Sequence, residues 1–260
     1  MSGKRRGLGL PREHGAWVML FSSLLLGVLA AWPVRASVAA LLLILLAGAF
    51  VAQEGLRRLP ARPPENPAVT WGAAAAALLS GCALWRRPGG EGLLVLAAAA
   101  GGVMLLQMLA PPRWRMGPWV QLAGVAGLTL GAPAAVVAAR GVLGRPAWWL
   151  WAACVLFFAG AVANVHLVIG APRATPAELA RAGRRHLATL AANLALVVVL
   201  VQQGRGGHPA LLAAAYGPVV VRALAGRRWA VSQPPLKRVG WWETAWALWF
   251  VAWTAGWART

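Results

Sequence analysis

The sequence predicts an all-α fold, a polytopic transmembrane helical bundle of about nine spans, and three observations predict it. Of the 260 residues, 60% are hydrophobic and 12% are charged, whereas about 25% of the residues of a soluble domain are charged. The charges occur in short clusters, and most of the runs between them approach the roughly 20 residues that a helix needs to cross a bilayer. No long polar segment separates the runs, so residues 1–260 are expected to form a single integral membrane domain.

The charge-free runs define the predicted spans in order. The first seven are long enough to cross a membrane. The eighth is short and contains Pro218, and the ninth includes Glu243 near its start, so eight spans is the alternative. The nine runs are residues 15–34, 36–53, 66–85, 92–112, 116–139, 146–172, 186–204, 206–221 and 239–258.

Small residues indicate close packing between these helices. Gly127 and Gly131 form a GxxxG pair in the fifth run, and Gly72, Ala76 and Ser80 form a stripe in the third. Such residues let helix backbones approach each other within lipid.

The distribution of positive charge predicts the orientation. With nine spans, 18 of the 25 Lys and Arg residues fall on the side of the N-terminus and seven on the other side. Because Lys and Arg accumulate in cytoplasmic loops, we expect the N-terminus in the cytoplasm and the C-terminus outside, in the cell inner (plasma) membrane. The longest polar loop, from Arg222 to Arg238, is expected to be a linker or a short interfacial helix.

The composition excludes several kinds of chemistry. The chain contains no Asp, so a Ser-His-Asp triad, a paired-Asp site and an Asp-rich magnesium motif are ruled out. Cys82 and Cys154 lie inside apolar runs, where a thiol behaves as a small hydrophobic group, and neither a disulfide nor a metal site is predicted. The formal net charge of +19 is explained by the cations that flank the apolar spans, and no nucleic-acid partner is expected. The sequence identifies no cofactor.

A polar cluster precedes the first span. Glu13 and His14 are followed by Gly15, Ala16 and Trp17. One interpretation is an interfacial anchor with its Trp at the depth of the lipid head groups; the other is a proton relay or a ligand contact made by the Glu-His pair. The HGAW tetrapeptide at the opening of an apolar span resembles the signature of the YwiC-like family, over about the first half of the chain. The resemblance implies a bacterial membrane protein and assigns no activity.

The predicted layout is also similar to that of the UbiA prenyltransferase superfamily. Those proteins hold a prenyl diphosphate through magnesium at Asp-rich motifs that end the second and sixth helices. The matching stretches here are residues 53–58 and 164–173, which contain no Asp. Magnesium-assisted prenyl transfer of the usual kind is therefore not implied.

Basic residues at these positions suggest a different way of binding an anion. Glu54 shares a helical face with Arg57 and Arg58, which is either a surface ion pair or part of a head-group site. Arginine suits phosphate because its planar guanidinium donates two parallel hydrogen bonds. Arg184 and Arg185 before the seventh span, and Lys237 and Arg238 before the ninth, are candidates to complete such a site; attraction to anionic lipid explains them equally well.

Three polar residues lie inside or near the ends of spans. Glu243 falls about one turn inside the ninth run, and an ionisable group there is a candidate functional residue. We expect its partner to be Lys237 or Arg238. Asn164 and His166 are candidates for ligand contacts, with hydrogen bonding between helices as the alternative.

These residues lead to one main hypothesis and two alternatives. The main hypothesis is an integral membrane protein that binds an anionic amphiphile, an isoprenoid or lipid diphosphate, at a basic pocket on the cytoplasmic side. If it catalyses a reaction, Glu13, His14, Glu54 and Glu243 are the candidates for proton transfer. The alternatives are a transporter for a small anion and a non-catalytic subunit of a membrane complex. Membrane lipid is a partner in each case.

Overall fold

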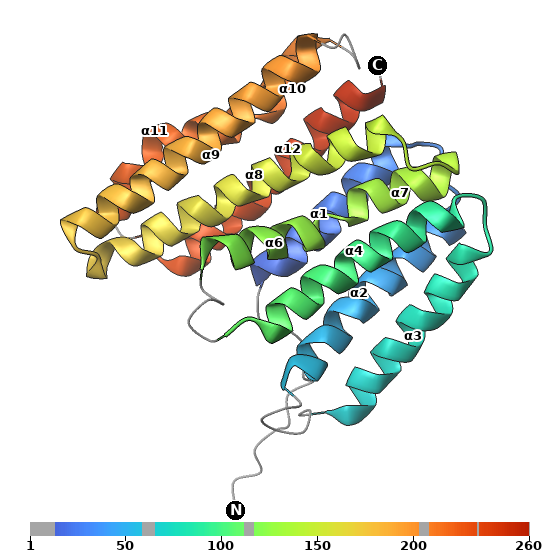
Figure 1. The fold of residues 1–260 in the computed structure, drawn as a ribbon. Helices are drawn as coiled ribbons and strands as arrows, with labels where there is room; N and C mark the ends of the chain where they lie inside the picture. The colour runs from blue at the N-terminus through green and yellow to red at the C-terminus, as the bar shows by residue number, and fades with distance from the viewer. Residues whose placement is uncertain (1–13, 59–65, 112–116, 203–207, 233, 260) are drawn as a thin grey trace, which may run out of the picture. The chain divides into compact units, whose positions relative to one another are not determined.

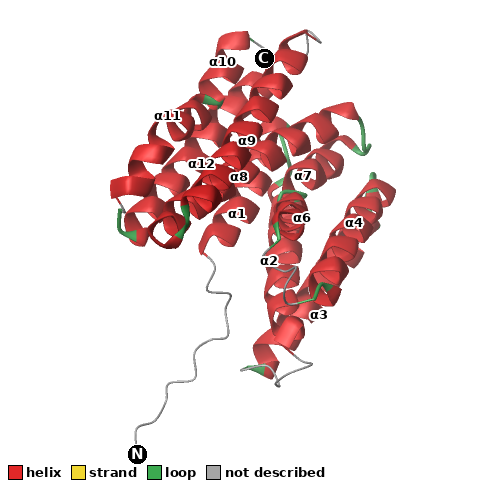
Figure 2. Cartoon of the chain, turned by 60° about the vertical axis from the view of Figure 1, so that its left-hand side comes forward, coloured by secondary structure: helices red, strands yellow, loops and turns green. Residues whose placement is uncertain are grey.

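The computed structural model of the protein is helical throughout, and it describes residues 14–58, 66–111, 117–202, 208–232 and 234–259 (Figure 1). No strand occurs in these ranges (Figure 2), so the predicted all-α fold is confirmed. The chain divides into two compact units, residues 1–147 (unit 1) and residues 148–260 (unit 2), and each is described by itself. That they act together as a single membrane domain stays a prediction.

The helices follow one another closely along the chain. Unit 1 contains α1 (His14–Ala30), α2 (Ala36–Arg58), α3 (Pro67–Trp85), α4 (Gly90–Leu109), α6 (Pro118–Leu128) and α7 (Gly131–Arg140). Helix α8 (Arg145–Gly170) begins just before the boundary. Unit 2 continues with the 3₁₀ turn η1 (Ala171–Arg173), α9 (Pro176–Gln202), α10 (Pro209–Ala215), α11 (Gly217–Ser232) and α12 (Leu236–Arg259).

If α6 and α7 are counted as one helical rod, and α10 and α11 as another, the helices correspond to the nine predicted runs. Within the ranges described above, seven rods are long and apolar enough to cross a membrane, and α1 is an apolar helix of 17 residues. Helix α12 has 24 residues but is not one of the seven. The chain is therefore a multi-pass membrane protein.

The fifth predicted span is broken into α6 and α7 because it contains Pro133. In a continuous helix the N–H of residue 133 would bond to the carbonyl of Thr129, and proline has no N–H. The N–H of Ala132 donates to Thr129 instead, over 3.2 Å, which shortens the turn. Ser23 of α1 places its Oγ 3.2 Å from the carbonyl oxygen of Leu128, so a neighbouring helix supplies a hydrogen-bond donor at the break.

The eighth predicted span is broken in the same way, at Pro218. The missing N–H of Pro218 would have bonded to the carbonyl of Ala214. The indole Nε1 of Trp249 in α12 donates to that carbonyl over 2.7 Å. A proline and a donor from another helix therefore occur together at the break in each unit, as expected where irregular backbone lies at membrane depth.

The segment from Arg222 to Arg238, predicted to be a linker or a short interfacial helix, is not a linker but is helical over most of its length. Helix α11 continues through Arg222 to Ser232, and α12 begins at Leu236. The charge of Arg222 does not end the helix because the side chain turns into unit 2 and is paired there.

Glycines allow the close contacts in unit 1. A Cβ added at Gly131 would lie 3.1 Å from the Ser23 Oγ of α1, and one at Gly127 would lie 2.9 Å from Val103 Cγ1 of α4. The predicted close packing at the GxxxG pair is therefore confirmed. The stripe predicted in α3 is wrong at Gly72, where an added Cβ would meet nothing within 4 Å, whereas Ser80 is buried as predicted and Gly48 of α2 packs against Ala73 and Ala77.

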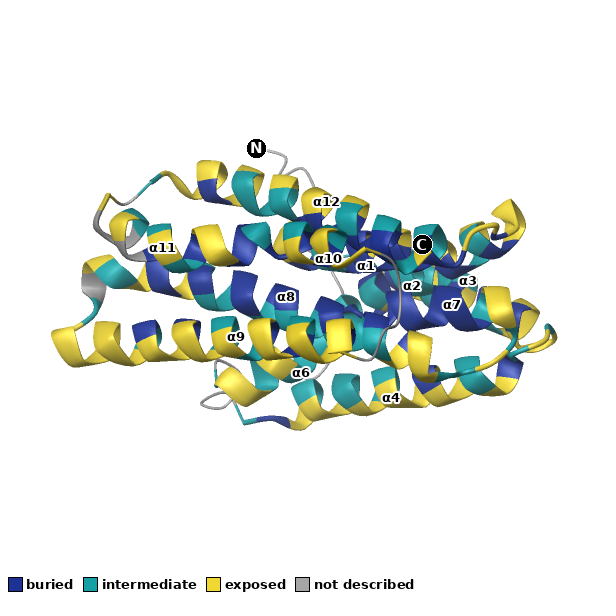
Figure 3. Ribbon diagram, turned by 90° about the horizontal axis from the view of Figure 1, so that it is seen from above, coloured by how far each residue is buried: buried dark blue, intermediate teal, exposed yellow. Residues whose placement is uncertain are grey.

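Apolar side chains cover the exposed faces of several helices. Helices α4 and α9 show long exposed faces (Figure 3), and Leu105 of α4 and Leu187 and Val198 of α9 are at least half exposed. Extended apolar surfaces of this kind are suited to contact with membrane lipid.

Candidate functional site

Four polar side chains converge inside unit 2 from four different helices. They are Asn164 of α8, His186 of α9, Arg222 of α11 and Glu243 of α12, and we call them the polar cluster. Arg222 has no exposed surface, Asn164 is 1% exposed and His186 is 5% exposed. Lys and Arg are almost never fully buried unless they are paired. The groups that contact the Arg222 side chain are therefore the core of the candidate site.

Glu243 is the centre of the hydrogen bonds in the polar cluster. Arg222 donates to both of its carboxylate oxygens, from Nη2 to Oε2 over 2.5 Å and from Nε to Oε1 over 3.3 Å. Asn164 donates from Nδ2 to Oε1 over 3.0 Å. The two-pronged ion pair balances the charges within the bundle, and the bond from Asn164 ties α8 to the same carboxylate.

Aromatic rings enclose the guanidinium group of Arg222. Its Cζ lies 4.6 Å from the ring centre of Phe157 and 5.1 Å from that of Trp246. Phe157 in turn stacks on Phe250 of α12 at a centroid distance of 4.1 Å. Contact with π faces adds electrostatic stabilisation to the cation, and the rings limit the access of water to the pair.

The polar cluster is not fully satisfied. Among the described residues, Asn164 Oδ1, Arg222 Nη1 and both ring nitrogens of His186 have no hydrogen-bond partner. The imidazole approaches the backbone of Arg222, but not in the geometry of a normal hydrogen bond. A buried polar atom without a partner costs about 1–3 kcal/mol, and several in one place mark the polar cluster as a candidate functional site.

The polar cluster lies towards one end of its helices. Glu243 is seven residues from the start of α12, and Arg222 is ten residues from the end of α11, which corresponds to depths of about 10 and 15 Å along the helix axes. This is the end predicted to face the cytoplasm.

Exposed cations occupy the same helix ends. They form what we call the basic rim: Arg184, Arg185, Arg228, Lys237 and Arg238. Arg238 lies over the ring of Trp242 at 4.9 Å, and Trp242 contacts Trp229 of α11 at a centroid distance of 5.0 Å. This end of unit 2 is thus positively charged and aromatic, as is common at a membrane interface.

The structure brings together only some of the residues predicted for the site. Asn164 and Glu243 meet as described. His166 is exposed on α8 and is not part of the polar cluster, because residues two positions apart on a helix point in different directions. Arg184, Arg185, Lys237 and Arg238 lie at the rim.

The other residues predicted for the site belong to unit 1. His14 is exposed at the start of α1, and Glu54 is half-buried in α2. Glu13 lies outside the described residues, as do the side chains of Arg57 and Arg58. A head-group site that joins Arg57 and Arg58 to the arginines of α9 stays a prediction.

The prediction that Glu243 pairs with Lys237 or Arg238 is wrong. Lys237 and Arg238 are exposed, and the ion pair is formed by Arg222 of α11. Sequence reasoning placed Arg222 in a loop because it follows an apolar run. The available signal was the Glu itself, since a carboxylate inside a span requires a cation on a neighbouring helix.

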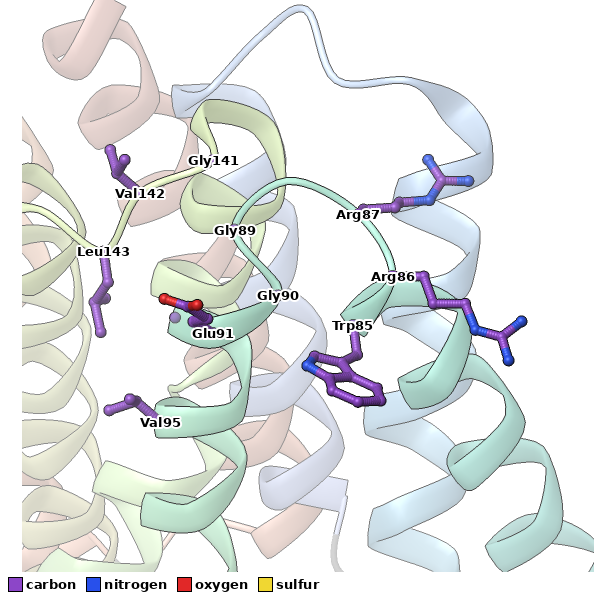
Figure 4. A pocket seen from close by; sticks show the side chains of 11 residues that line it. Trp85, Arg86, Arg87, Gly89, Gly90, Glu91, Val95, Gly141, Val142 and Leu143 are labelled. Atoms are coloured by element: carbon purple, nitrogen blue, oxygen red, sulfur yellow. The ribbon is translucent and has the colours of Figure 1, made fainter.

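Unit 1 contains a separate, open pocket of about 740 Å³. It is formed by the α3–α4 turn and the segment that follows α7, with Trp85, Glu91 and Leu143 among its lining residues. Figure 4 shows Arg86 and Arg87 directed away from Glu91. None of the residues predicted for the site lines this pocket. No group of three potential metal-ligating His, Cys or Glu side chains occurs in the part of the chain that the structure describes.

Comparisons with known proteins support one of the two resemblances. No curated protein and no solved structure matches the chain, so the similarity to the UbiA layout has no support from them. A family model described as YwiC-like protein matches residues 10–136. This match includes His14, Gly15, Ala16 and Trp17 and extends into α7. The chain is therefore similar to YwiC-like proteins over about half of its length.

Proposed function

We propose that this multi-pass membrane protein binds an amphiphile with an anionic head, of the isoprenoid or lipid diphosphate class, at the basic end of unit 2. The positive-inside distribution favours the cytoplasmic side of the plasma membrane for that end. The observation on which the proposal rests is the basic rim, whose exposed arginines Arg184 and Arg185 lie on the helix that also carries His186 of the polar cluster.

The basic rim supplies the charge that such a head group requires. Glu243 balances the charge of Arg222, so the positive charge in excess comes from the exposed cations, among them Arg184 and Arg185 on α9. A guanidinium group donates two parallel hydrogen bonds to phosphate oxygens. The exposed apolar side chains of Leu187 and Leu194 follow along α9 and provide a surface for a hydrocarbon tail.

The proposal concerns binding and assigns no reaction. The Asp residues that hold magnesium in the UbiA prenyltransferases have no counterpart in this chain. If a reaction follows binding, Glu243 is the candidate for proton transfer in unit 2, and Glu13, His14 and Glu54 are the candidates in unit 1.

Native mass spectrometry of the purified protein tests the proposal. Geranylgeranyl diphosphate serves as the probe and phosphatidylglycerol as the competitor, so that a diphosphate is distinguished from general anionic lipid. We expect the R184Q/R185Q variant to lose at least tenfold in probe affinity. The matched control is R86Q/R87Q, two adjacent arginines of unit 1, of which Arg86 is exposed and Arg87 half-buried; this variant should bind as the unaltered protein does. Equal binding by both variants would remove the head-group site from unit 2.

A second candidate function, transport of a small anion, is favoured by the Arg222–Glu243 pair. Ionisable groups inside spanning segments occur along the ion and proton pathways of transporters. Uptake of phosphate into proteoliposomes, abolished by R222M, would support transport. Probe binding without uptake would favour the amphiphile.

A further inference from the structure

The open pocket of unit 1 contains a carboxylate that is not neutralised by a neighbouring cation. Glu91, in the first turn of α4, is the one acidic residue among those that line the pocket. In the part of the chain that the structure describes, no cationic side chain forms an ion pair with Glu91, although Arg86 and Arg87 line the same pocket. Both arginines are directed away from the carboxylate (Figure 4). A negative charge at the wall of the pocket is therefore available to a ligand.

The turn between α3 and α4 separates the arginines from Glu91. Gly89 has a φ of +86°, a left-handed conformation that favours glycine, and an added Cβ there would lie 2.9 Å from the Cα of Gly141. A Cβ at Gly90 would collide with the carbonyl oxygen of Trp85. Backbone contacts therefore fix this turn against the segment that follows α7.

An indole ring and an apolar wall flank the carboxylate. Trp85 is 56% exposed, and its Cδ1 lies 3.0 Å from the position of a Cβ at Gly90, the residue before Glu91. On the other side, Leu143 Cβ lies 3.1 Å from the position of a Cβ at Gly92, the residue after Glu91. An exposed indole attracts a cation, as a carboxylate does. One carboxylate supplies too few oxygen ligands for a calcium ion, so the surroundings favour an organic ammonium group.

The arginines and the exposed face of α4 restrict the ligand further. With Arg86 and Arg87 among the lining residues, the pocket carries a net positive charge. This charge repels a molecule that is itself a net cation and tolerates one whose ammonium is accompanied by an anionic group. Leu94 and Val95 continue from the pocket along α4 and are 50% and 53% exposed, on a helix long and apolar enough to cross a membrane. A zwitterionic head with a hydrocarbon tail meets both conditions.

We infer that the pocket at the α3–α4 turn binds the ammonium group of a zwitterionic aminophospholipid of the phosphatidylethanolamine class. Glu91 is the counter-ion of the ammonium group, which donates hydrogen bonds to the carboxylate, and the acyl chains lie along α4. The inference is independent of the proposed function, because it concerns the other unit and a head group that carries a positive charge. The predicted orientation would make this a lipid of the outer leaflet.

The substitution E91Q tests the inference, because it removes the charge and retains the size of the side chain. Native mass spectrometry of the full chain in detergent, titrated with dioleoyl phosphatidylethanolamine, measures the affinity. We expect E91Q to bind this lipid about fivefold more weakly than the unaltered protein does. The matched control is E178Q, because Glu178 is also an exposed glutamate in the first turn of its helix, α9. E178Q should bind phosphatidylethanolamine as the unaltered protein does.

A second lipid distinguishes loss of the counter-ion from general damage to the pocket. Phosphatidylglycerol has the same kind of tail and phosphate but no ammonium group, so E91Q should not weaken its binding. A loss that is specific to phosphatidylethanolamine and absent in E178Q would support the inference. Unchanged affinity of E91Q for phosphatidylethanolamine, or an equal loss for both lipids, would overturn it.

Discussion

Arg222 and Glu243 form a two-pronged ion pair inside unit 2, although 21 residues separate them along the chain. The guanidinium is completely buried, and 15% of the Glu243 side chain is exposed. Each charge would be costly in a bilayer if it were alone. The pair therefore ties α11 to α12 and makes each residue depend on the other.

Removal of one member of the pair should destabilise the protein more than removal of both. R222M or E243Q leaves an uncompensated buried group, and we expect each to lower the free energy of unfolding by about 3–5 kcal/mol. The double variant R222M/E243Q should be less destabilised than the sum of the two. Unfolding by SDS in mixed micelles measures these differences.

The matched control is R228M, because Arg228 is an exposed arginine on the same helix. It should change the free energy of unfolding by less than about 0.5 kcal/mol. If the loss of unfolding free energy in the double variant equals the sum of the losses in the two single variants, Arg222 and Glu243 have no coupling energy.

A second prediction concerns the contact between α1 and α7. A Cβ at Gly27 would collide with the carbonyl oxygen of Ala132 and lie 2.8 Å from the Cβ of Ala135. G27A should therefore push the helices apart and cost about 1–3 kcal/mol in the same SDS titration. G101A is the control in unit 1, since a Cβ there meets nothing within 4 Å; equal stability of the two variants would contradict the close approach.

A third prediction concerns a polar contact between α2 and α4. Gln53 Nε2 donates to Gln107 Oε1 over 3.0 Å. Hydrogen bonds between spanning helices contribute about 0.6 kcal/mol on average and up to about 1.7 kcal/mol. A cycle of Q53L, Q107L and the double variant should give a coupling energy within this range, and a coupling of zero would show that the two amides act independently.

The predicted orientation can be tested by cysteine labelling. In a background with C82A and C154A, R87C lies in the turn after α3 and R228C on the exposed side of α11. A membrane-impermeant maleimide should label R87C in intact cells and R228C only after the inner face is exposed. The reverse pattern would place the N-terminus outside and move the basic rim to the outer surface.

Much of the fold follows from the sequence because a bilayer imposes a length on each apolar run. The runs match the helical rods even where Pro133 and Pro218 break them. The runs do not reveal the direction in which a charged side chain points. Arg222 follows an apolar run, and this pattern is the same whether the residue lies in a loop or pairs with a residue of another helix. Only the packing of α11 against α12 distinguishes these two cases.

Only part of the polar cluster could be predicted from the sequence. Glu243 and Asn164 stand out because they are polar residues inside apolar runs. His186 directly follows Arg184 and Arg185, and composition alone treats the three as one basic cluster. The helical rotation of about 100° per residue turns His186 into the core while the two arginines stay exposed. The close approach of Asn164 and His186 to Gly226 depends on three helices and has no signature in any one of them.

The bond from Trp249 to the Ala214 carbonyl has a consequence for how this sequence can change over evolutionary time. Replacement of Pro218 by another residue would restore a backbone N–H and offer Ala214 its ordinary helical partner, so the tryptophan would become dispensable. Loss of Trp249 first would deprive the carbonyl of its donor while the proline still withholds the other. We therefore expect substitution at position 218 to precede substitution at position 249, and related chains that keep the proline to keep a hydrogen-bond donor at this place on α12.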